Sequence, residues 1–244
     1  MNYQIRGKGR NLFFIHGWGC DSRVWAKLVE SLSKKFCVIT IDLRGYGKSE
    51  WRSENDLLDA FATDILMLCK ELNLKEINFI GWSLGCYVIF ELLGNAPEII
   101  NSIVLVGGTP KFLKGDGFEF GFEGSNLRLM RRRLNRDFNG ALLDFCRSIF
   151  FENNEGPQPN KDALISSLNI LEHADFRQDI KRIDTPTLIV CGEGDSITPK
   201  AASEYLHKEI KGSKLVIIKD AGHVPFLTRP KEFNRILEKW INGR

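Results

Sequence analysis

A single serine stands between two glycines at the point where one apolar run ends and the next begins. The residues Gly81-Trp82-Ser83-Leu84-Gly85 fit the pattern G-x-S-x-G within the stretch FIGWSLGCYV. Where a buried strand turns at once into a helix, this pattern forms a strained turn that exposes the serine as a nucleophile, and the glycines permit that turn. So short a match also arises by chance. The partner residues and the surrounding elements therefore decide its meaning.

A serine hydroxyl needs a base to take its proton and an acid to orient that base. Asp195 and His223 each follow an apolar run of strand length, and with Ser83 they stand in the chain order serine, acid, histidine. The carboxyl ends of parallel strands are where open α/β sheets place their sites. Glu193 stands too early in its loop to be the acid, and Asp220 is too close to the histidine. The sequence predicts a triad of Ser83, Asp195 and His223.

The motif HGWG, which follows the first buried apolar run, supplies a second part of the predicted site. Its glycines let the backbone approach the serine, so that the amide of Trp18 can join that of Leu84 in stabilising negative charge on a bound carbonyl. We interpret His16, the first residue of the motif, as a brace for this loop rather than as a second base. We expect Trp18, Trp82 and Phe226 to contact the substrate.

A phosphate-binding motif is only partly present in DLRGYGKSE. The residues Gly47-Lys48-Ser49 match the end of a P-loop, but Asp42 stands where the motif requires its first glycine. We therefore expect Asp42 and Arg44 to be structural partners in a tight turn after a strand.

The elements that would position these residues follow from the apolar pattern. Short apolar runs of strand length lie at 12–15, 37–41, 77–80, 102–106, 185–192 and 214–218. Amphipathic stretches with helical spacing lie near 23–33, 55–72, 83–95 and 230–241. Alternation of strand and helix predicts an α/β fold with a doubly wound, mostly parallel sheet. We expect a core of residues 1–108 and 185–244, interrupted by a helical lid at 109–184.

The composition favours a globular protein. A chain of 244 residues with 43% hydrophobic content can bury a sizeable core. The first residues are polar and basic, and no run of about eighteen apolar residues occurs, so we expect no signal peptide, no membrane span and a cytoplasmic location. Six cysteines without a C-x-x-C pair suggest buried, reduced thiols. A net charge of +3 is too small to indicate nucleic-acid binding by itself.

The lid contains a basic amphipathic stretch, NLRLMRRRLNRDF (126–138). At about 100° per residue, one helical face collects apolar side chains and another collects arginines. The apolar face is predicted to hold Leu127, Met130, Leu134 and Phe138. The other face holds Arg128, Arg132 and Arg136, which we call the arginine ridge. An outward ridge of this kind favours an acidic partner, and the alternative is an ordinary solvated surface.

The motifs HGWG, DLRGYGKS, GWSLG, GEGD and AGHVPF, in this order, resemble those of the α/β-hydrolase superfamily over nearly the whole chain. Within it, the tryptophan before the serine and the histidine motif are most similar to the esterases of biotin synthesis that hydrolyse pimeloyl-carrier-protein methyl ester. The resemblance implies an α/β-hydrolase fold, a serine carboxylic ester hydrolase without metal or organic cofactor, and docking of acyl carrier protein on the arginine ridge. Cys86, where the family usually has a second glycine, is expected to pack beneath the serine turn.

Other functions remain open on the same fold. They are a broad short-chain carboxylesterase, a related hydrolase or lyase with the same triad, and a receptor or scaffold without activity.

Overall fold

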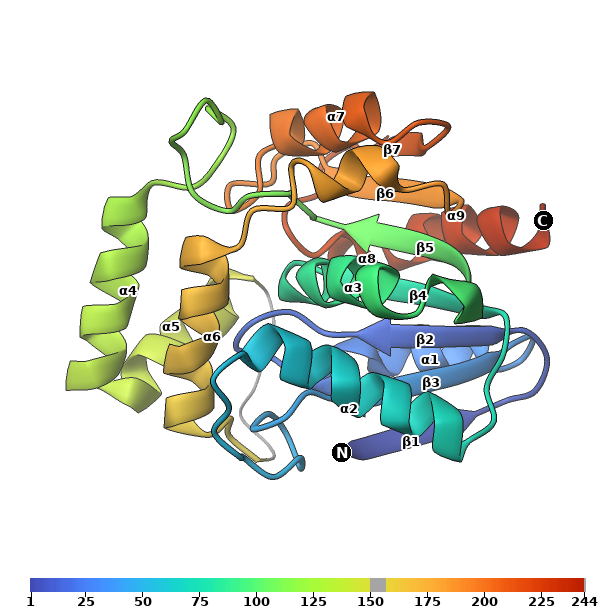
Figure 1. Ribbon diagram of the computed structural model, residues 1–244, viewed down its shortest axis with the longest axis horizontal. Helices are drawn as coiled ribbons and strands as arrows, with labels where there is room; N and C mark the ends of the chain where they lie inside the picture. The colour runs from blue at the N-terminus through green and yellow to red at the C-terminus, as the bar shows by residue number, and fades with distance from the viewer. Residues whose placement is uncertain (150–156, 244) are drawn as a thin grey trace.

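A seven-stranded sheet forms the centre of the computed structural model, which describes residues 1–149 and 157–243 (Figure 1). Its strand order is β1-β3-β2-β4-β5-β6-β7, with β1 antiparallel to β3 and the other pairs parallel. The strands are β1 (Asn2–Arg6), β2 (Asn11–Ile15), β3 (Cys37–Asp42), β4 (Ile77–Trp82), β5 (Ile100–Val106), β6 (Thr187–Gly192) and β7 (Lys214–Ile218). The helices are η1 (Ser22–Trp25), α1 (Ala26–Leu32), α2 (Leu57–Glu71), α3 (Leu84–Asn95), η2 (Pro97–Ile99), α4 (Gly124–Arg136), α5 (Phe138–Ser148), α6 (Lys161–His173), η3 (Asp179–Arg182), α7 (Lys200–Glu209), α8 (Pro225–Thr228) and α9 (Pro230–Asn242).

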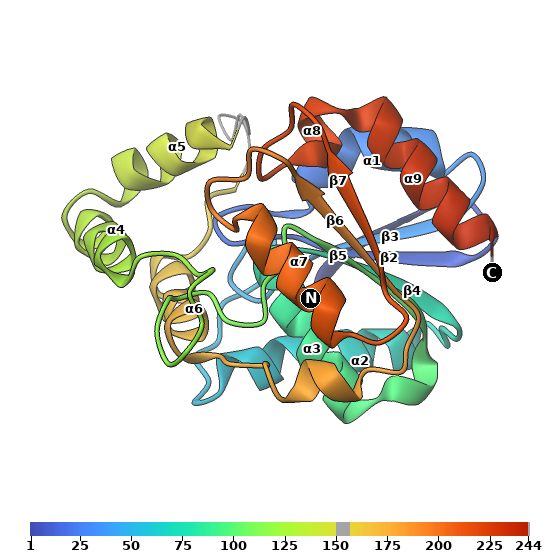
Figure 2. The same cartoon turned by 90° about the horizontal axis from the view of Figure 1, so that it is seen from above.

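The parallel strands coincide with the apolar runs of the sequence because helices cover both faces of the sheet. All six residues of β4 are buried. Figure 2 shows α2 and α3 on one face and α1 and α9 on the other. Each covering helix buries one apolar stripe, such as Phe61 and Ile65 in α2 and Phe233 and Leu237 in α9. The predicted doubly wound, mostly parallel sheet is confirmed.

Between β5 and β6 the chain leaves the sheet and forms α4, α5 and α6. These helices lie together beyond the carboxyl ends of the strands, at the left of Figure 1. The division into a core and a lid at residues 109 and 184 stays our prediction.

The basic stretch of the lid is not one continuous helix. Helix α4 ends at Arg136, and the backbone of Asp137 is not helical. The side-chain carboxylate of Asp137 accepts the amide N–H of Gly140 and so caps α5. Phe138 therefore begins α5 and does not share the α4 face, which corrects that part of the prediction. Leu127 and Leu134 are buried as expected.

Two sequence expectations concern the whole chain. None of the six cysteines forms a disulfide among the described residues, and all except Cys37 are buried. Within residues 1–149 and 157–243, no helix combines the length and the apolar character needed to cross a bilayer.

Candidate active site

Ser83 occupies a strained turn between β4 and α3. Its φ of +53° lies in the left-handed region that residues with a side chain rarely adopt. Its amide donates to the carbonyl of Val106 at the end of β5, at 3.0 Å. A Cβ on Gly81 would lie 2.5 Å from the carbonyl oxygen of Gly85, and a Cβ on Gly85 would lie 2.4 Å from that of Ile15. Both glycines of the motif are therefore required by close backbone packing.

His223 and Asp195 form a buried pair on the loops that follow β7 and β6. Nδ1 of the histidine lies 2.8 Å from Oδ2 of the carboxylate. The other carboxylate oxygen accepts the amide N–H groups of Ile197 and Thr198, each at 2.9 Å. The indole N–H of Trp82 donates to the backbone carbonyl of His223 at 2.8 Å. Both members of the pair are thus held by neighbouring groups.

The surroundings of Asp195 keep its carboxyl group ionised. Burial favours the neutral acid, but the electrostatic attraction of the His223 ring, the hydrogen bond from that ring and the amides of Thr198 and Ile197 outweigh it. The net effect lowers the pKa of Asp195 below its usual value. An ionised carboxylate accepts the Nδ1–H of His223, so Nε2 of the ring is left able to accept a proton.

Two of the residues expected to contact the substrate lie in the core beneath the site. Trp82 is 1% exposed and Phe226 is 0% exposed, and their rings pack edge to face with centroids 5.3 Å apart. The ring of Trp82 also packs against that of His223 at 5.4 Å. Neither Trp82 nor Phe226 borders the cavity into which Ser83 opens. The expected contact of both residues with substrate is therefore corrected: Trp82 packs against His223, and Phe226 packs against Trp82.

The loop after β2 lies against the start of α3, where it can supply a second amide to the serine turn. A Cβ on Gly85 would lie 3.1 Å from the carbonyl oxygen of His16, which measures how closely the two segments pack. Among the described residues, neither the amide of Trp18 nor that of Leu84 donates a hydrogen bond to another protein group. Two such amides, one at the start of α3 and one in the loop after β2, suit a developing negative charge.

His16 holds this loop in place. Its Nε2 accepts the amide N–H of Leu43 at 3.0 Å, and its Nδ1 lies 2.9 Å from the carbonyl oxygen of Gly17. This pair of contacts fits a neutral ring that donates from Nδ1. Burial lowers the pKa of His16, which also favours the neutral form. The interpretation of His16 as a structural brace is confirmed.

Ser83 and His223 border one cavity of about 310 Å³ beneath α4, α5 and α6. Trp18 also borders it, and its indole N–H donates to the carbonyl of Leu164 in α6 at 3.0 Å. The remaining wall is mainly apolar: Phe112, Phe122, Asn126, Leu127, Leu129, Met130, Arg133, Phe145, Ser148, Leu168, Leu171 and Ile197. Such a cavity suits a hydrophobic acyl chain whose reactive group meets Ser83.

Comparison with known proteins agrees with this geometry. The family model described as the alpha/beta hydrolase fold matches residues 10–230. The chain belongs to the alpha/beta hydrolase family. This hydrolase is 30% identical over 251 residues to pimeloyl-[acyl-carrier protein] methyl ester esterase of Nitrosomonas europaea, with 96% of each chain covered. It is 29% identical to the enzyme of the same name from Aeromonas hydrophila, again with 96% of each chain covered.

Solved structures give the same assignment for the fold. The esterase EaEST from Exiguobacterium antarcticum matches this hydrolase with a TM-score of 0.91 at 25% identity, covering 98% of this chain and 94% of that one. A bromoperoxidase from Bacillus anthracis matches with a TM-score of 0.89 at 26% identity and the same coverage. The relatives named as esterases support ester hydrolysis as the class of reaction.

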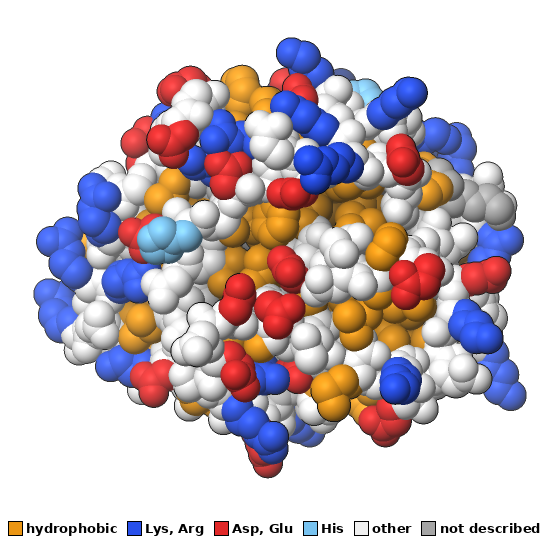
Figure 3. Space-filling view, in the orientation of Figure 1, with side chains coloured by type: hydrophobic (Ala, Val, Ile, Leu, Met, Phe, Trp, Pro, Cys, Tyr) orange, Lys and Arg blue, Asp and Glu red, His pale blue; other side chains and the backbone are white. Residues whose placement is uncertain are grey.

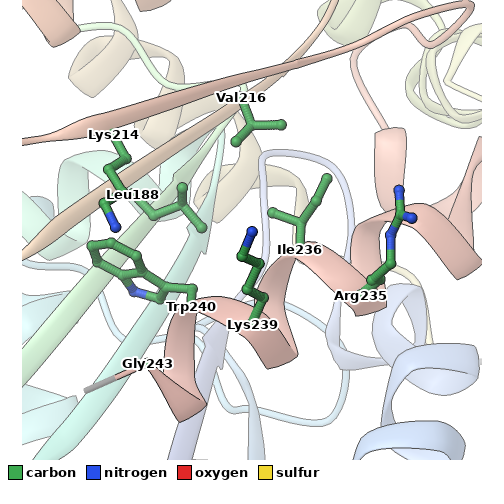
Figure 4. Close-up of a pocket in the computed structure, with 8 residues that line it drawn as sticks. All are labelled: Leu188, Lys214, Val216, Arg235, Ile236, Lys239, Trp240 and Gly243. Carbon is green, nitrogen blue, oxygen red and sulfur yellow. The ribbon is translucent and has the colours of Figure 1, made fainter.

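A larger groove of about 660 Å³ lies between β7 and α9 of this hydrolase (Figure 4). It is lined by Leu188, Lys214, Val216, Arg235, Ile236, Lys239, Trp240 and Gly243. This lining contains no serine, histidine or carboxylate, so the smaller cavity at Ser83 is the better candidate for ester chemistry. Among the described residues, no cluster of three His, Cys, Asp or Glu side chains could hold a metal ion.

The arginine ridge lies on the exposed surface of α4. All three of its side chains are exposed, and Figure 3 shows basic side chains along the left edge of the molecule, where Figure 1 places α4. The arginines between them have partners: Arg131 pairs with Glu172 at 2.6 Å, and Arg133 pairs with Asp144. The ridge therefore faces solvent beside ion pairs that hold the lid helices.

Three residues assigned structural roles from the sequence have them. Asp42 accepts two backbone amides from the turns around it, each at 2.9 Å. Arg44 pairs with Asp64 of α2 at 2.7 Å. Cys86 lies beneath the serine turn, where its thiol donates to the carbonyl of Gly81 at 3.2 Å and burial raises its pKa to about 12.

Thr198 lies at the pair of Asp195 and His223, although no sequence motif indicates it. Its hydroxyl touches both Asp195 and His223. The available signal was the hydroxyl residue closely following the acid in GEGDSITP, but many loops contain such a residue.

Proposed function

We propose that this hydrolase cleaves carboxylic esters with Ser83 as nucleophile, His223 as base and Asp195 as the acid that orients the base. The observation that carries the proposal is that a strained, half-buried serine borders the same apolar cavity as the histidine of a buried histidine–carboxylate pair. This is the arrangement that acyl transfer through a serine requires.

The reaction begins when Oγ of Ser83 attacks the ester carbonyl while Nε2 of His223 takes the hydroxyl proton. The carbonyl oxygen becomes negative and is stabilised by the amides of Trp18 and Leu84. His223 then gives the proton to the leaving alcohol, and an acyl-enzyme remains. Water, activated by the same histidine, releases the acid and regenerates Ser83. Asp195 keeps Nδ1 protonated throughout, so that Nε2 stays available for proton transfer.

We further propose that the substrate is the methyl ester of pimeloyl-carrier protein, and that the reaction serves biotin synthesis. The names of the relatives support this substrate. The apolar cavity suits the methylene chain of a pimeloyl group, with the ester at Ser83 and the carrier outside. The exposed arginine ridge on α4 suits an acidic carrier protein, because opposite charges steer association and fix orientation.

Substitution of the nucleophile tests the mechanism. Ser83→Ala is expected to lower kcat for p-nitrophenyl butyrate and for the carrier-bound methyl ester by about 10⁴ to 10⁶. Ser148→Ala is the matched control, because this serine borders the same cavity and has no assigned role. Retention of more than about a tenth of wild-type kcat by folded Ser83→Ala would overturn the mechanism, since tenfold is only about 1.4 kcal/mol of barrier. An inactive wild type would instead favour a receptor or scaffold.

Charge reversal on the arginine ridge tests the carrier. An exposed charge pair contributes about 0.5 kcal/mol, and replacing all three arginines by glutamate also adds repulsion. We expect KM for the carrier-bound ester to rise by at least about tenfold, or 1.4 kcal/mol, with KM for p-nitrophenyl butyrate unchanged. Added salt should raise the KM of the wild type for the carrier-bound ester towards that of the variant, because exposed charges are screened within about 10 Å at 0.1 M.

The groove between β7 and α9 offers a matched control for this experiment. Three exposed cations line this groove and do not line the cavity at Ser83: Lys214, Arg235 and Lys239. Replacing all three by glutamate gives the same change in net charge as the ridge variant. This control should leave KM for the carrier-bound ester near the wild-type value. Equal effects of the two triple variants would show that only net charge matters. No effect of either would favour a broad short-chain carboxylesterase.

A further inference from the structure

The hydroxyl of Thr198 lies at the meeting point of three loops. Its Oγ1 is 2.8 Å from Oδ2 of Asp195, 2.9 Å from the carbonyl oxygen of Gly107 and 3.2 Å from Nδ1 of His223. These three groups follow β6, β5 and β7, respectively. Thr198 is only 3% exposed, so its hydroxyl bonds to protein groups in a place that bulk water does not reach.

The available donors and acceptors limit the hydrogen bonds that the Thr198 hydroxyl can make. Oδ1 of Asp195 already accepts two backbone amides, and Oδ2 accepts the Nδ1–H of His223. The threonine has one proton, which it can donate to Oδ2 or to the carbonyl of Gly107, and its lone pairs face Nδ1 of the ring. Oδ2 is thereby enclosed between the ring N–H and the hydroxyl.

Gly107 makes this arrangement compact. Its φ of +53° is in the left-handed region, and a Cβ at this position would lie 3.1 Å from Nδ1 of His223 and 3.3 Å from Oδ2 of Asp195. The bare backbone therefore comes close to the pair, and its carbonyl oxygen lies 2.9 Å from the hydroxyl of Thr198.

We propose that Thr198 is a positioning residue that keeps Oδ2 of Asp195 in line with Nδ1 of His223 and ties both to the end of β5. This inference rests on the proposed triad and adds a fourth side chain to it. When the base takes up the proton of Ser83, the positive ring must stay aligned with the carboxylate. A buried hydroxyl that limits rotation of the carboxylate supplies that alignment without touching the substrate.

The test is the isosteric substitution Thr198→Val, which removes the hydroxyl and keeps the volume. We expect kcat for p-nitrophenyl butyrate to fall by about tenfold to a hundredfold with KM unchanged, because the substrate cavity is not altered. Thr198→Ser should restore most of kcat. A second readout is the downfield NMR resonance of the Nδ1 proton of His223, to be measured in the free enzyme. It should shift or broaden in the valine variant and return in the serine variant.

Thr109→Val is the matched control. Thr109 is 2% exposed, and its hydroxyl donates to the carbonyl of Lys111 rather than to Asp195 or His223. The Thr109→Val variant loses the hydroxyl of a similarly buried threonine and should keep wild-type kcat. Equal kcat values for the Thr198→Val and Thr109→Val variants, or an unchanged Nδ1 resonance, would overturn the inference. Failure of the triad itself would look different, because Ser83→Ala would then remain active.

Discussion

Replacing Asp195 by asparagine tests how the acid controls the base. Oδ1 of Asp195 accepts the amides of Ile197 and Thr198, each at 2.9 Å. An asparagine must keep its carbonyl oxygen in that place, because its NH₂ group would otherwise oppose two N–H donors. The NH₂ group then faces Nδ1 of His223, where the carboxylate accepted a hydrogen bond at 2.8 Å.

Two donors cannot share one hydrogen bond, so the ring of His223 must move its proton to Nε2. In this tautomer Nε2 donates and cannot take the proton of Ser83. The corresponding change in a serine protease lowers kcat by about 10⁴, and we expect a loss of this size, which is about 5 kcal/mol of barrier. The fold should be retained, because every backbone contact of the side chain survives.

The assay is kcat for p-nitrophenyl butyrate at pH 7, with the melting temperature measured on the same preparation. Asp220→Asn is the control, since Asp220 is exposed and pairs with Arg229 at the surface, at 3.2 Å. It should keep nearly full activity. If Asp220→Asn were the inactive variant, or if Asp195→Asn kept more than about a tenth of kcat, which is 1.4 kcal/mol, the assignment of the acid would be refuted.

Two further predictions concern the frame of the site. Burial would raise the pKa of Asp42, but its hydrogen bonds with Lys48 and Ser22 outweigh burial and lower it below the usual 3.8. Its stabilising effect is therefore complete above that value and lost as pH falls through the lower folded-state pKa. Asp42→Asn should lower the free energy of unfolding, measured with urea at pH 7, by about 2 kcal/mol. A difference between wild type and variant that did not shrink in acid would contradict this. Gly107→Ala, which puts a Cβ 3.1 Å from Nδ1 of His223, should lower kcat while KM stays constant; wild-type kcat would show that the loop yields without disturbing the pair.

The sequence by itself determined the main elements of the sheet and predicted a candidate triad. Apolar runs of strand length predicted the parallel strands, because a strand covered on both faces must be apolar throughout. The pattern around Ser83 predicted the turn, because only glycine fits where backbone approaches backbone so closely. Ser83, Asp195 and His223 could be predicted as a triad because each follows an apolar run of strand length, and open α/β sheets place their sites at the carboxyl ends of strands.

The tertiary structure alone decided how these residues are surrounded. Trp82 and Phe226 could have bordered the cavity or supported it from below, and packing of segments distant in the sequence placed them below. The break of the basic stretch at Asp137 depended on which cap the backbone adopted. Thr198 could be recognised only once the loops after β5, β6 and β7 had met. Burial and hydrogen-bond partners arise from such long-range contacts, which local periodicity does not encode.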